Sequence, residues 1–193
     1  FWTNEQADWL RKINQDFKSI YIVDYFPFVG KYIPILKKKK IISIFPVTPF
    51  QDKYIFEYMP SNHYYNLDNS INFINHILNC IKNDEVQIII KLKRDNPHMH
   101  DEYKKFIDNL KKDERITIID PNISAKSIIV KSDLVISSPY TSTSLIANHY
   151  KIPTIFYDSS SSITQEEPRL KKVQLLKSEM ELFQWIKEVL EKK

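Results

Sequence analysis

Glycine is almost absent from this sequence. Gly30 is the only one among 193 residues, whereas average usage is about 7%. Dinucleotide-binding loops, P-loops and nucleophile elbows all need glycines at fixed spacing. The sequence therefore excludes classical dinucleotide dehydrogenases, P-loop NTPases and protein kinases. Any phosphate that this protein binds must be held by hydroxyl groups and helix N-termini instead.

Cysteines and long apolar runs are also scarce. Cys80 is the only cysteine, which excludes a disulfide framework and cysteine-rich zinc modules. The longest apolar runs, such as residues 86–90, fall far short of the roughly 20 residues that a membrane-spanning helix needs. There is no signal-peptide pattern. We therefore expect a cytoplasmic protein, with peripheral association at the inner face of the cytoplasmic membrane as an alternative.

The remaining composition is typical of a folded domain. The chain is 42% hydrophobic and 27% charged, with a net charge of +4, which excludes wholesale disorder. Its length suits one domain with a full core. The basic run Lys37–Lys40 and the pI of about 8.9 permit nucleic-acid binding, but such a run is more often a solvated lead-in to a strand. We expect no nucleic-acid partner.

The chain divides into two regions. Residues 1–36 carry a short helical pattern followed by Pro27, Gly30 and Pro34, which predicts an N-terminal helix and linker remaining from a preceding domain. The chain begins with Phe-Trp-Thr rather than Met, so we expect it to be part of a longer protein. Residues 37–193 form the main domain.

Strand-like and helix-like patterns alternate through this main domain. Strands are predicted at residues 41–45, 86–92, 116–119, 134–137 and 154–157. Helices are predicted at residues 71–81, 101–112, 124–131, 142–150 and 178–190. The alternation predicts an α/β fold, a Rossmann-like doubly wound parallel sheet of about five to six strands with helices on both faces.

The commonest doubly wound order predicts where a ligand binds. It places the first strand between the second and the fourth, with the third strand outside the second. The chain direction then reverses between strands 41–45 and 134–137, and ligands bind beyond the carboxyl ends of the strands at such a reversal. The predicted site therefore lies between the loop at residues 46–50 and the loop at residues 138–144.

Hydroxyl groups gather in the second of these loops. A helix N-terminus offers unpaired N–H groups and about half a positive charge, and it binds anions. The alternative is that one serine or threonine merely caps the helix. Because so many hydroxyls cluster at the predicted reversal, we favour a phosphate site. Its residues are Ser138, Thr141, Ser142 and Thr143.

Neighbouring loops offer further candidates. Arg94 has a planar fork suited to phosphate or carboxylate, although a solvated strand end is the alternative for this stretch. His98 is a candidate phosphate donor and the one candidate acid or base. Thr48 could add a hydroxyl to the pocket. Asp158 ends a strand, where it either bonds a ribose or sugar hydroxyl or only meets solvent.

A metal site is not expected. His98 and His100 form a pair, but no carboxylate or cysteine constellation accompanies them. We therefore expect no metal and no cofactor.

The apolar residues near the C-terminus predict a packed helix. They begin with Leu175 and Leu176 and continue between lysines and glutamates to Leu190. The mixed charge favours packing against the sheet, while association with a membrane surface is the alternative.

Two segments resemble a known family. Residues 132–144 read SDLVISSPYTSTS and residues 152–158 read IPTIFYD. Together they resemble the C-terminal domain of GT-B glycosyltransferases, and more narrowly the bacterial polysaccharide-biosynthesis proteins named for a Pro-Phe-Thr-Ser motif. Here that motif reads Pro139-Tyr140-Thr141-Ser142. The serine-rich turn is also similar to the phosphate-binding serines of bacterial sialyltransferases, whose His-Pro pair appears here in the reverse order, Pro97-His98.

The resemblance covers roughly residues 40–160 and implies a function. It implies the donor-binding domain of a glycosyltransferase for surface polysaccharide, lipopolysaccharide or O-antigen. A CMP- or UDP-linked sugar would be the substrate, and a glycan or lipid-linked molecule the acceptor. A separate N-terminal domain, missing from this chain, would hold that acceptor and the catalytic base, so this chain would be inactive alone.

Two other functions stay open at this point. A nucleotide-sugar 2-epimerase on the same fold would need acid and base carboxylates close to the sugar. A non-catalytic α/β binding module is the other alternative, although residues 45–48 lack the acidic cluster that a phosphoreceiver carries.

Overall fold

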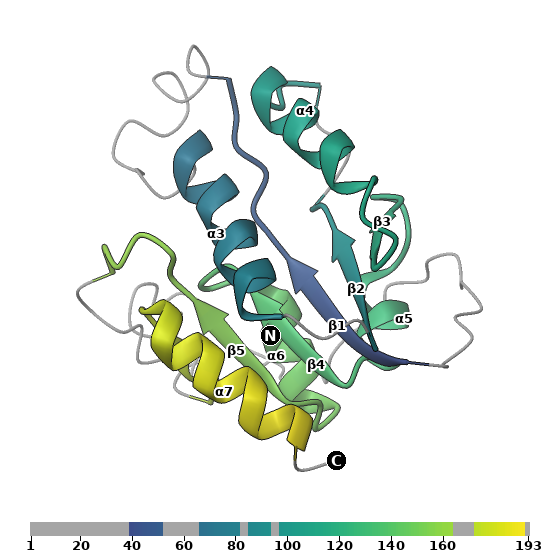
Figure 1. Ribbon diagram of the computed structural model, residues 1–193, viewed down its shortest axis with the longest axis vertical. Coiled ribbons are helices and arrows are strands. Elements are labelled where there is room, and N and C mark those ends of the chain that lie inside the picture. Colours follow the sequence, from purple (N-terminus) through teal and green to yellow (C-terminus); the bar gives the residue numbers. More distant parts are fainter. Residues whose placement is uncertain (1–38, 52–65, 82–84, 94–96, 164–171, 192–193) are drawn as a thin grey trace, which may run out of the picture.

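The computed structural model describes residues 39–51, 66–81, 85–93, 97–163 and 172–191 (Figure 1). Arg94 and the predicted N-terminal helix and linker at residues 1–36 lie outside the described residues. The division at residues 36 and 37 therefore stays a prediction.

Six parallel strands form one sheet in the order β3-β2-β1-β4-β5-β6. They are β1 (Lys40–Phe45), β2 (Val86–Lys91), β3 (Ile116–Ile119), β4 (Leu134–Ser137), β5 (Thr154–Tyr157) and β6 (Leu175–Leu176). The Rossmann-like doubly wound fold and the predicted order of the first four strands are confirmed. One assignment was wrong: Leu175 and Leu176 do not belong to the terminal helix, because they pair with Phe156 and Tyr157 as an edge strand.

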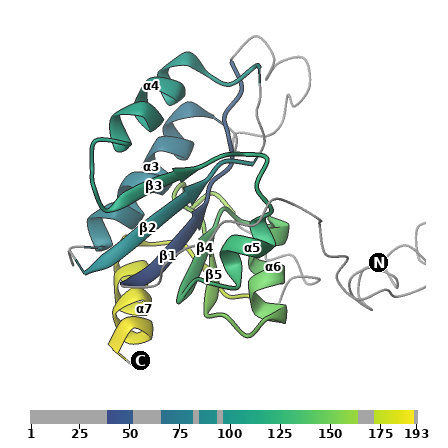
Figure 2. The same cartoon turned by 90° about the vertical axis from the view of Figure 1, so that its right-hand side faces the viewer.

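Helices cover both faces of this sheet (Figure 2). They are α3 (Leu67–Cys80), α4 (Asp101–Leu110), α5 (Ala125–Ile129), α6 (Ser142–His149) and α7 (Glu179–Glu191). α3, α4 and α7 pack on one face, and α5 and α6 pack on the other. This is the layered arrangement that alternating strands and helices predict.

The alternating side chains of β1 explain the two cores. Ile42 and Ile44 point into the cluster that contains α3, α4 and α7, whereas Ile41 and Phe45 point into the cluster that contains α5 and α6. Successive side chains of a strand face opposite sides of the sheet. A strand that is apolar on both sides is therefore buried on both faces.

The start of β4 is fixed to β1 by a buried carboxylate. The backbone N–H of Ile41 donates to Asp133 Oδ2 at 2.9 Å, and the backbone N–H of Asp133 donates to the Ile41 carbonyl at 2.8 Å. The register that follows pairs Phe45 with Ser137. The carboxyl ends of β1 and β4 therefore lie side by side, at the predicted reversal.

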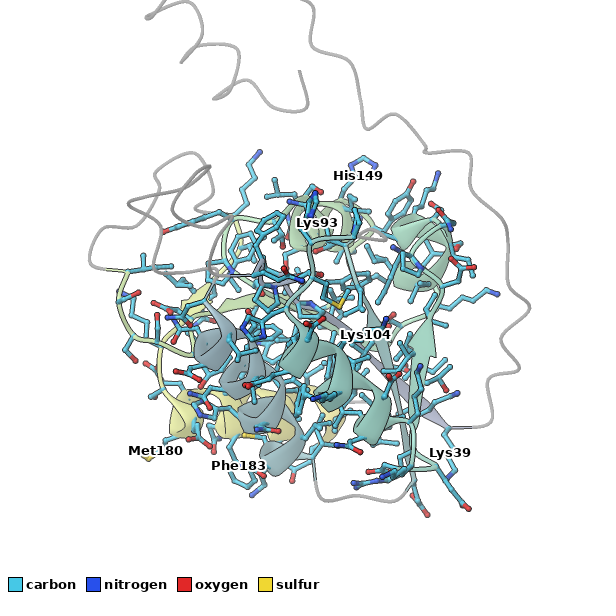
Figure 3. The ribbon with its side chains drawn as sticks, turned by 90° about the horizontal axis from the view of Figure 1, so that it is seen from above. Lys39, Lys93, Lys104, His149, Met180 and Phe183 are labelled. Carbon is cyan, nitrogen blue, oxygen red and sulfur yellow. The ribbon has the colours of Figure 1, made fainter. Side chains whose placement is uncertain are left out.

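The terminal helix α7 packs on the sheet through one side only. Leu182 and Ile186 are buried in the core, while Met180 is 79% exposed and Phe183 is 47% exposed. Figure 3 shows both exposed side chains pointing away from the ribbon. None of the described helices is long and apolar enough to span a bilayer.

Candidate functional site

The loop after β1, residues 46–51, meets the loop after β4, residues 138–141. We call them the β1 loop and the β4 loop. The backbone N–H of Val47 donates to Ser138 Oγ at 3.1 Å, and the backbone N–H of Ser138 donates to the Phe45 carbonyl at 3.1 Å. Ser138 is buried. Its hydroxyl therefore holds the two loops together at the reversal point.

Hydroxyls in the β4 loop and directly beside it, from Ser137 to Thr143, form a connected chain. Thr141 Oγ1 donates to the Ser138 carbonyl at 2.9 Å and lies 3.1 Å from Thr143 Oγ1. Thr143 Oγ1 in turn lies 2.7 Å from the hydroxyl of Ser137. A hydroxyl is both a donor and an acceptor, so such a chain fixes each member's orientation. Ser138, Thr141 and Thr143 thus lie close together, and their binding of phosphate stays a prediction.

This chain leaves the start of α6 uncapped. Thr141 is the N-cap residue, with φ −85° and ψ 149°, but in the described structure its side chain makes no capping hydrogen bond to α6. The first turn of α6 also contains no acidic residue. The first N–H groups of a helix have no partner inside the helix, so these groups are available to an anion. Ser142, the first helical residue, is exposed beside them.

Two other helices contrast with α6. At α3, Asn66 Oδ1 accepts the backbone N–H of Asn69 at 2.7 Å. At α4, the ring nitrogen Nδ1 of His100 accepts the backbone N–H of Glu102 at 3.2 Å. Both helices also carry acidic residues in the first turn. Their N-termini are thus already supplied with acceptors and negative charge, which α6 lacks.

Thr48 adds a buried hydroxyl to the β1 loop. Thr48 is 5% exposed, and its Oγ1 finds no hydrogen-bond partner in the part of the chain that the structure describes. Buried polar atoms are nearly always hydrogen-bonded, and an exception calls for an explanation. Val47, the residue before it, bonds the β4 loop. An unused hydroxyl therefore lies one residue from the junction of the two loops.

His98 belongs to the segment that lies against the other side of the β1 loop. The His98 carbonyl accepts the backbone N–H of Gln51 at 3.0 Å, and the backbone N–H of His100 donates to the Pro49 carbonyl at 3.1 Å. The His98 side chain is exposed. His98 is thus connected through the β1 loop to the β4 loop, but no described contact joins its ring to the hydroxyl chain.

His100 caps α4, which gives it a structural partner. Across the described ranges, no three histidine, cysteine, aspartate or glutamate side chains gather closely enough to hold a metal ion. The sequence expectation of a metal-free site stays a prediction.

Asp158 is fully buried, with 0% exposure. Its Oδ1 accepts the backbone N–H of Ser160 at 3.0 Å and the Ser160 hydroxyl at 2.6 Å, and its Oδ2 accepts the backbone N–H of Ile163 at 2.9 Å. The carboxylate therefore organises the loop of residues 158–163, which we call the β5 loop. A contact with ribose or sugar stays a prediction for Asp158.

Lys91, at the end of β2, is buried and was not among the site residues predicted from the sequence. Lys91 Nζ donates to the carbonyls of Leu92 at 3.1 Å and Pro121 at 3.0 Å. Burial lowers the pKa of this ammonium, and the nearby carboxylate of Asp120 opposes that shift. Its bonds join the end of β2 to the loop after β3. A lysine at the end of a strand that has one other polar residue, Gln87, is the only sequence signal for this role.

A cleft of about 450 Å³ opens between α4 and the ends of β2 and β3. Met99, Lys104, Ile118 and Asp120 are among the residues that line it, and Figure 3 labels Lys104. It is bordered by α4 and β3 rather than by the predicted hydroxyls. In the sheet order, β1 and β2 separate β3 from β4, so the cleft and the start of α6 are separate features.

The sequence matches a known protein family over almost its whole length. The sequence model of the family described as "Polysaccharide biosynthesis PFTS motif protein" matches residues 1–186. No match was found among curated proteins.

Solved structures show the same fold at low sequence identity. Spinosyn rhamnosyltransferase SpnG is 13% identical with a TM-score of 0.54, and the match covers 91% of this chain and 45% of that one. A protein described as a UDP-N-acetylglucosamine 2-epimerase, from Listeria monocytogenes, is 12% identical with a TM-score of 0.50, covering 80% of this chain and 37% of that one. The chain thus spans less than half the length of either structure.

Proposed function

Because the chain belongs to the family of polysaccharide biosynthesis PFTS motif proteins, we propose that residues 37–193 bind the nucleotide-sugar donor of a glycosyltransferase reaction. The single observation that carries this proposal is the uncapped start of α6, surrounded by the hydroxyl chain of the β4 loop at the reversal of the sheet. The fold shared with a rhamnosyltransferase agrees with it.

The chemistry of sugar transfer explains the need for such a site. When the sugar departs, negative charge develops on the nucleotide phosphate that is left behind. Donors that are already oriented toward this charge lower the barrier, because they need no rearrangement during the reaction. The N–H groups at the start of α6 and the hydroxyl of Ser142 are donors of this kind.

The other predicted residues have supporting roles in this proposal. Ser138, Thr141 and Thr143 hold the loop in the conformation that leaves the α6 start open. Thr48 offers its unused hydroxyl to the ligand. Arg94 and His98, which follow β2 in the sequence, are the candidates for phosphate binding and for proton transfer, respectively. Asp158 keeps the β5 loop folded beside the donor's sugar.

The finer assignment follows the resemblance. We propose a CMP- or UDP-linked sugar as donor and a glycan or lipid-linked molecule as acceptor, in the synthesis of surface polysaccharide, lipopolysaccharide or O-antigen. The acceptor and the catalytic base would lie on a further domain of the protein. Peripheral association with the cytoplasmic membrane would bring the enzyme to a lipid-linked acceptor.

The direct test is to place a carboxylate where the phosphate would bind. In calorimetric titrations with CMP, UDP and GDP, we expect one nucleotide to bind the wild-type chain and Ser142→Asp to abolish that binding. Aspartate in the first turn of a helix is itself favourable, so this variant should unfold at the same temperature as the wild type or a higher one. Ser142→Asn, which has nearly the same shape without the charge, is the matched control and should still bind.

Two results would contradict the proposal. Unchanged affinity in Ser142→Asp would place any nucleotide site away from α6. If none of the nucleotides binds the wild-type chain, the donor-binding function itself fails for this chain. Conversion of a free nucleotide-sugar without acceptor would favour the epimerase alternative over transfer.

A further inference from the structure

Tyr140, the aromatic residue of the motif, is unusually exposed for its size. It is 40% exposed, one of four large hydrophobic side chains so exposed among the described residues. It directly precedes Thr141, the N-cap residue of α6. An aromatic ring therefore lies open to solvent immediately beside the proposed phosphate site.

The backbone at Tyr140 adds to this observation. Its φ is 59°, in the left-handed region, where a bulky residue is uncommon and glycine is at ease. Residues held in such conformations cluster at ligand-binding and active sites. Lys151 and Ser161 share this conformation among the described residues, so the exposed aromatic ring rather than the backbone distinguishes Tyr140.

The ring is held in place by a neighbour in the sheet. The centroids of Tyr140 and Phe156 are 6.0 Å apart, with an angle of 58° between the ring planes. Phe156 is buried in β5 and pairs with Ser137 of β4. This tilted contact is a favourable aromatic geometry. It fixes one part of the Tyr140 ring, while 40% of the residue stays exposed.

We propose that Tyr140 stacks on the nucleobase of the nucleotide whose phosphate lies at the start of α6. This inference rests on the proposed function and adds a second contact to the same site. A nucleobase is flat, apolar on its faces and separated from its phosphate by one ribose ring. An aromatic ring two residues before Ser142 can therefore contact the base while the start of α6 holds the phosphate. Stacking on an aromatic side chain tolerates any base, because every base has a flat face.

The test compares ligands with and without a base. The ligands are the nucleotide that binds the wild-type chain, ribose 5-phosphate and inorganic pyrophosphate. We expect Tyr140→Gly to weaken the nucleotide by roughly fivefold to a hundredfold, the range of alanine substitutions at stacking aromatics. Ribose 5-phosphate and pyrophosphate should bind Tyr140→Gly and the wild type equally. Glycine suits the left-handed backbone, so this variant should fold.

Two further variants separate stacking from simple apolar contact. Tyr140→Phe keeps the ring and should retain the nucleotide affinity. Tyr140→Leu keeps an apolar side chain without a ring and should lose it. Thermal unfolding of each variant checks that the fold is intact.

The outcomes distinguish this inference from the proposed function. Equal nucleotide affinity in Tyr140→Gly and wild type overturns the stacking role, and Ser142→Asp still tests the phosphate site. An equal loss for pyrophosphate overturns it too, because the ring would then act only on the loop. A loss confined to nucleotide-sugars, absent for the free nucleotide, assigns the ring to the sugar and overturns base stacking. If no nucleotide binds the wild-type chain, the proposed function and this inference fail together.

Discussion

The β4 loop and the β5 loop follow neighbouring parallel strands, and both carry several hydroxyl side chains, but they use their donors differently. In the β5 loop, the carboxylate of Asp158 accepts two backbone N–H groups and one hydroxyl. In the β4 loop there is no carboxylate, the hydroxyls bond one another and the backbone, and the start of α6 stays uncapped. Hydroxyl side chains thus take part in one closed loop and one open loop.

This difference indicates which of the two loops is suited to bind an anionic ligand. A carboxylate in the β5 loop already supplies the negative charge that the loop's donors attract. At the start of α6, neither the N-cap side chain nor an acidic residue of the first turn supplies such a partner. A group of hydroxyl side chains alone therefore does not indicate an anion site. The informative feature is a set of donors without a carboxylate of their own.

The largest expected effect comes from removing the internal anion of the closed loop. Asp158→Ala should lower the free energy of unfolding by about 3 kcal/mol, since hydrogen bonds to a buried charged group are strong and their donors would be left unsatisfied. Urea unfolding monitored by circular dichroism measures this. Asp158→Asn, which keeps one acceptor oxygen, should lose less. A loss below about 1 kcal/mol for the alanine variant would mean that the β5 loop does not depend on its carboxylate.

A smaller effect is expected from breaking the hydroxyl chain of the open loop. Thr143→Val keeps the shape but removes the bonds to Ser137 and Thr141. We expect a loss of about 1 kcal/mol, which corresponds to a decrease in melting temperature of roughly 2–4 °C for a chain of this size. Nucleotide affinity should also fall. The control is Thr143→Ser, which keeps the hydroxyl and should retain both properties. An unchanged affinity in Thr143→Val would show that the chain does not organise the ligand site.

The arrangement of the sheet could be predicted because its signals are local and repeated. Strands that are buried on both faces are apolar nearly throughout, and helices separate them at regular intervals. The strand order then follows from the right-handed crossover rule, which is how the reversal between β1 and β4 was found. β6 was missed because two residues, Leu175 and Leu176, are too short to show any period.

The side-chain partners of the site could not be predicted in the same way. The three bonds of Asp158 depend on the path of the β5 loop, where Ser161 adopts a φ of 52°. The burial of Lys91 depends on the carbonyl of Pro121, 30 residues further along the chain. Sequence patterns report which residues share a face, but they do not report where an irregular backbone directs its carbonyl and N–H groups.

The smallest expected effect concerns α7, whose start is closed by a reciprocal pair. Glu181 Oε2 accepts the backbone N–H groups of Lys177 and Ser178, and the Ser178 hydroxyl accepts the backbone N–H of Glu181. This is a capping box. The hydrogen bond from the Lys177 backbone, followed by that from the Ser178 hydroxyl, lowers the pKa of the Glu181 carboxyl.

A lowered pKa in the folded state makes this contribution sensitive to acid. The stabilisation is complete above the ordinary pKa of glutamate, about 4.5, and it is lost as the pH falls through the lower pKa of the folded state. Between neutral pH and pH 3, we expect the free energy of unfolding, measured in urea, to fall less in Glu181→Gln than in the wild type. The fall will be only partly reduced because Asp113, paired with Arg115, also has a lowered pKa, and the difference will be small because Glu181 is exposed.

Glu188→Gln makes the same change of charge on the same helix, away from its start, and is the matched control. It should leave the acid-dependent loss of stability close to that of the wild type. If both variants respond alike, net charge rather than the capping box governs the effect. If only Glu181→Gln responds, the start of α7 is held by a carboxylate that titrates. The start of α6, whose first turn contains no acidic residue, then differs from it in chemistry as well as in geometry.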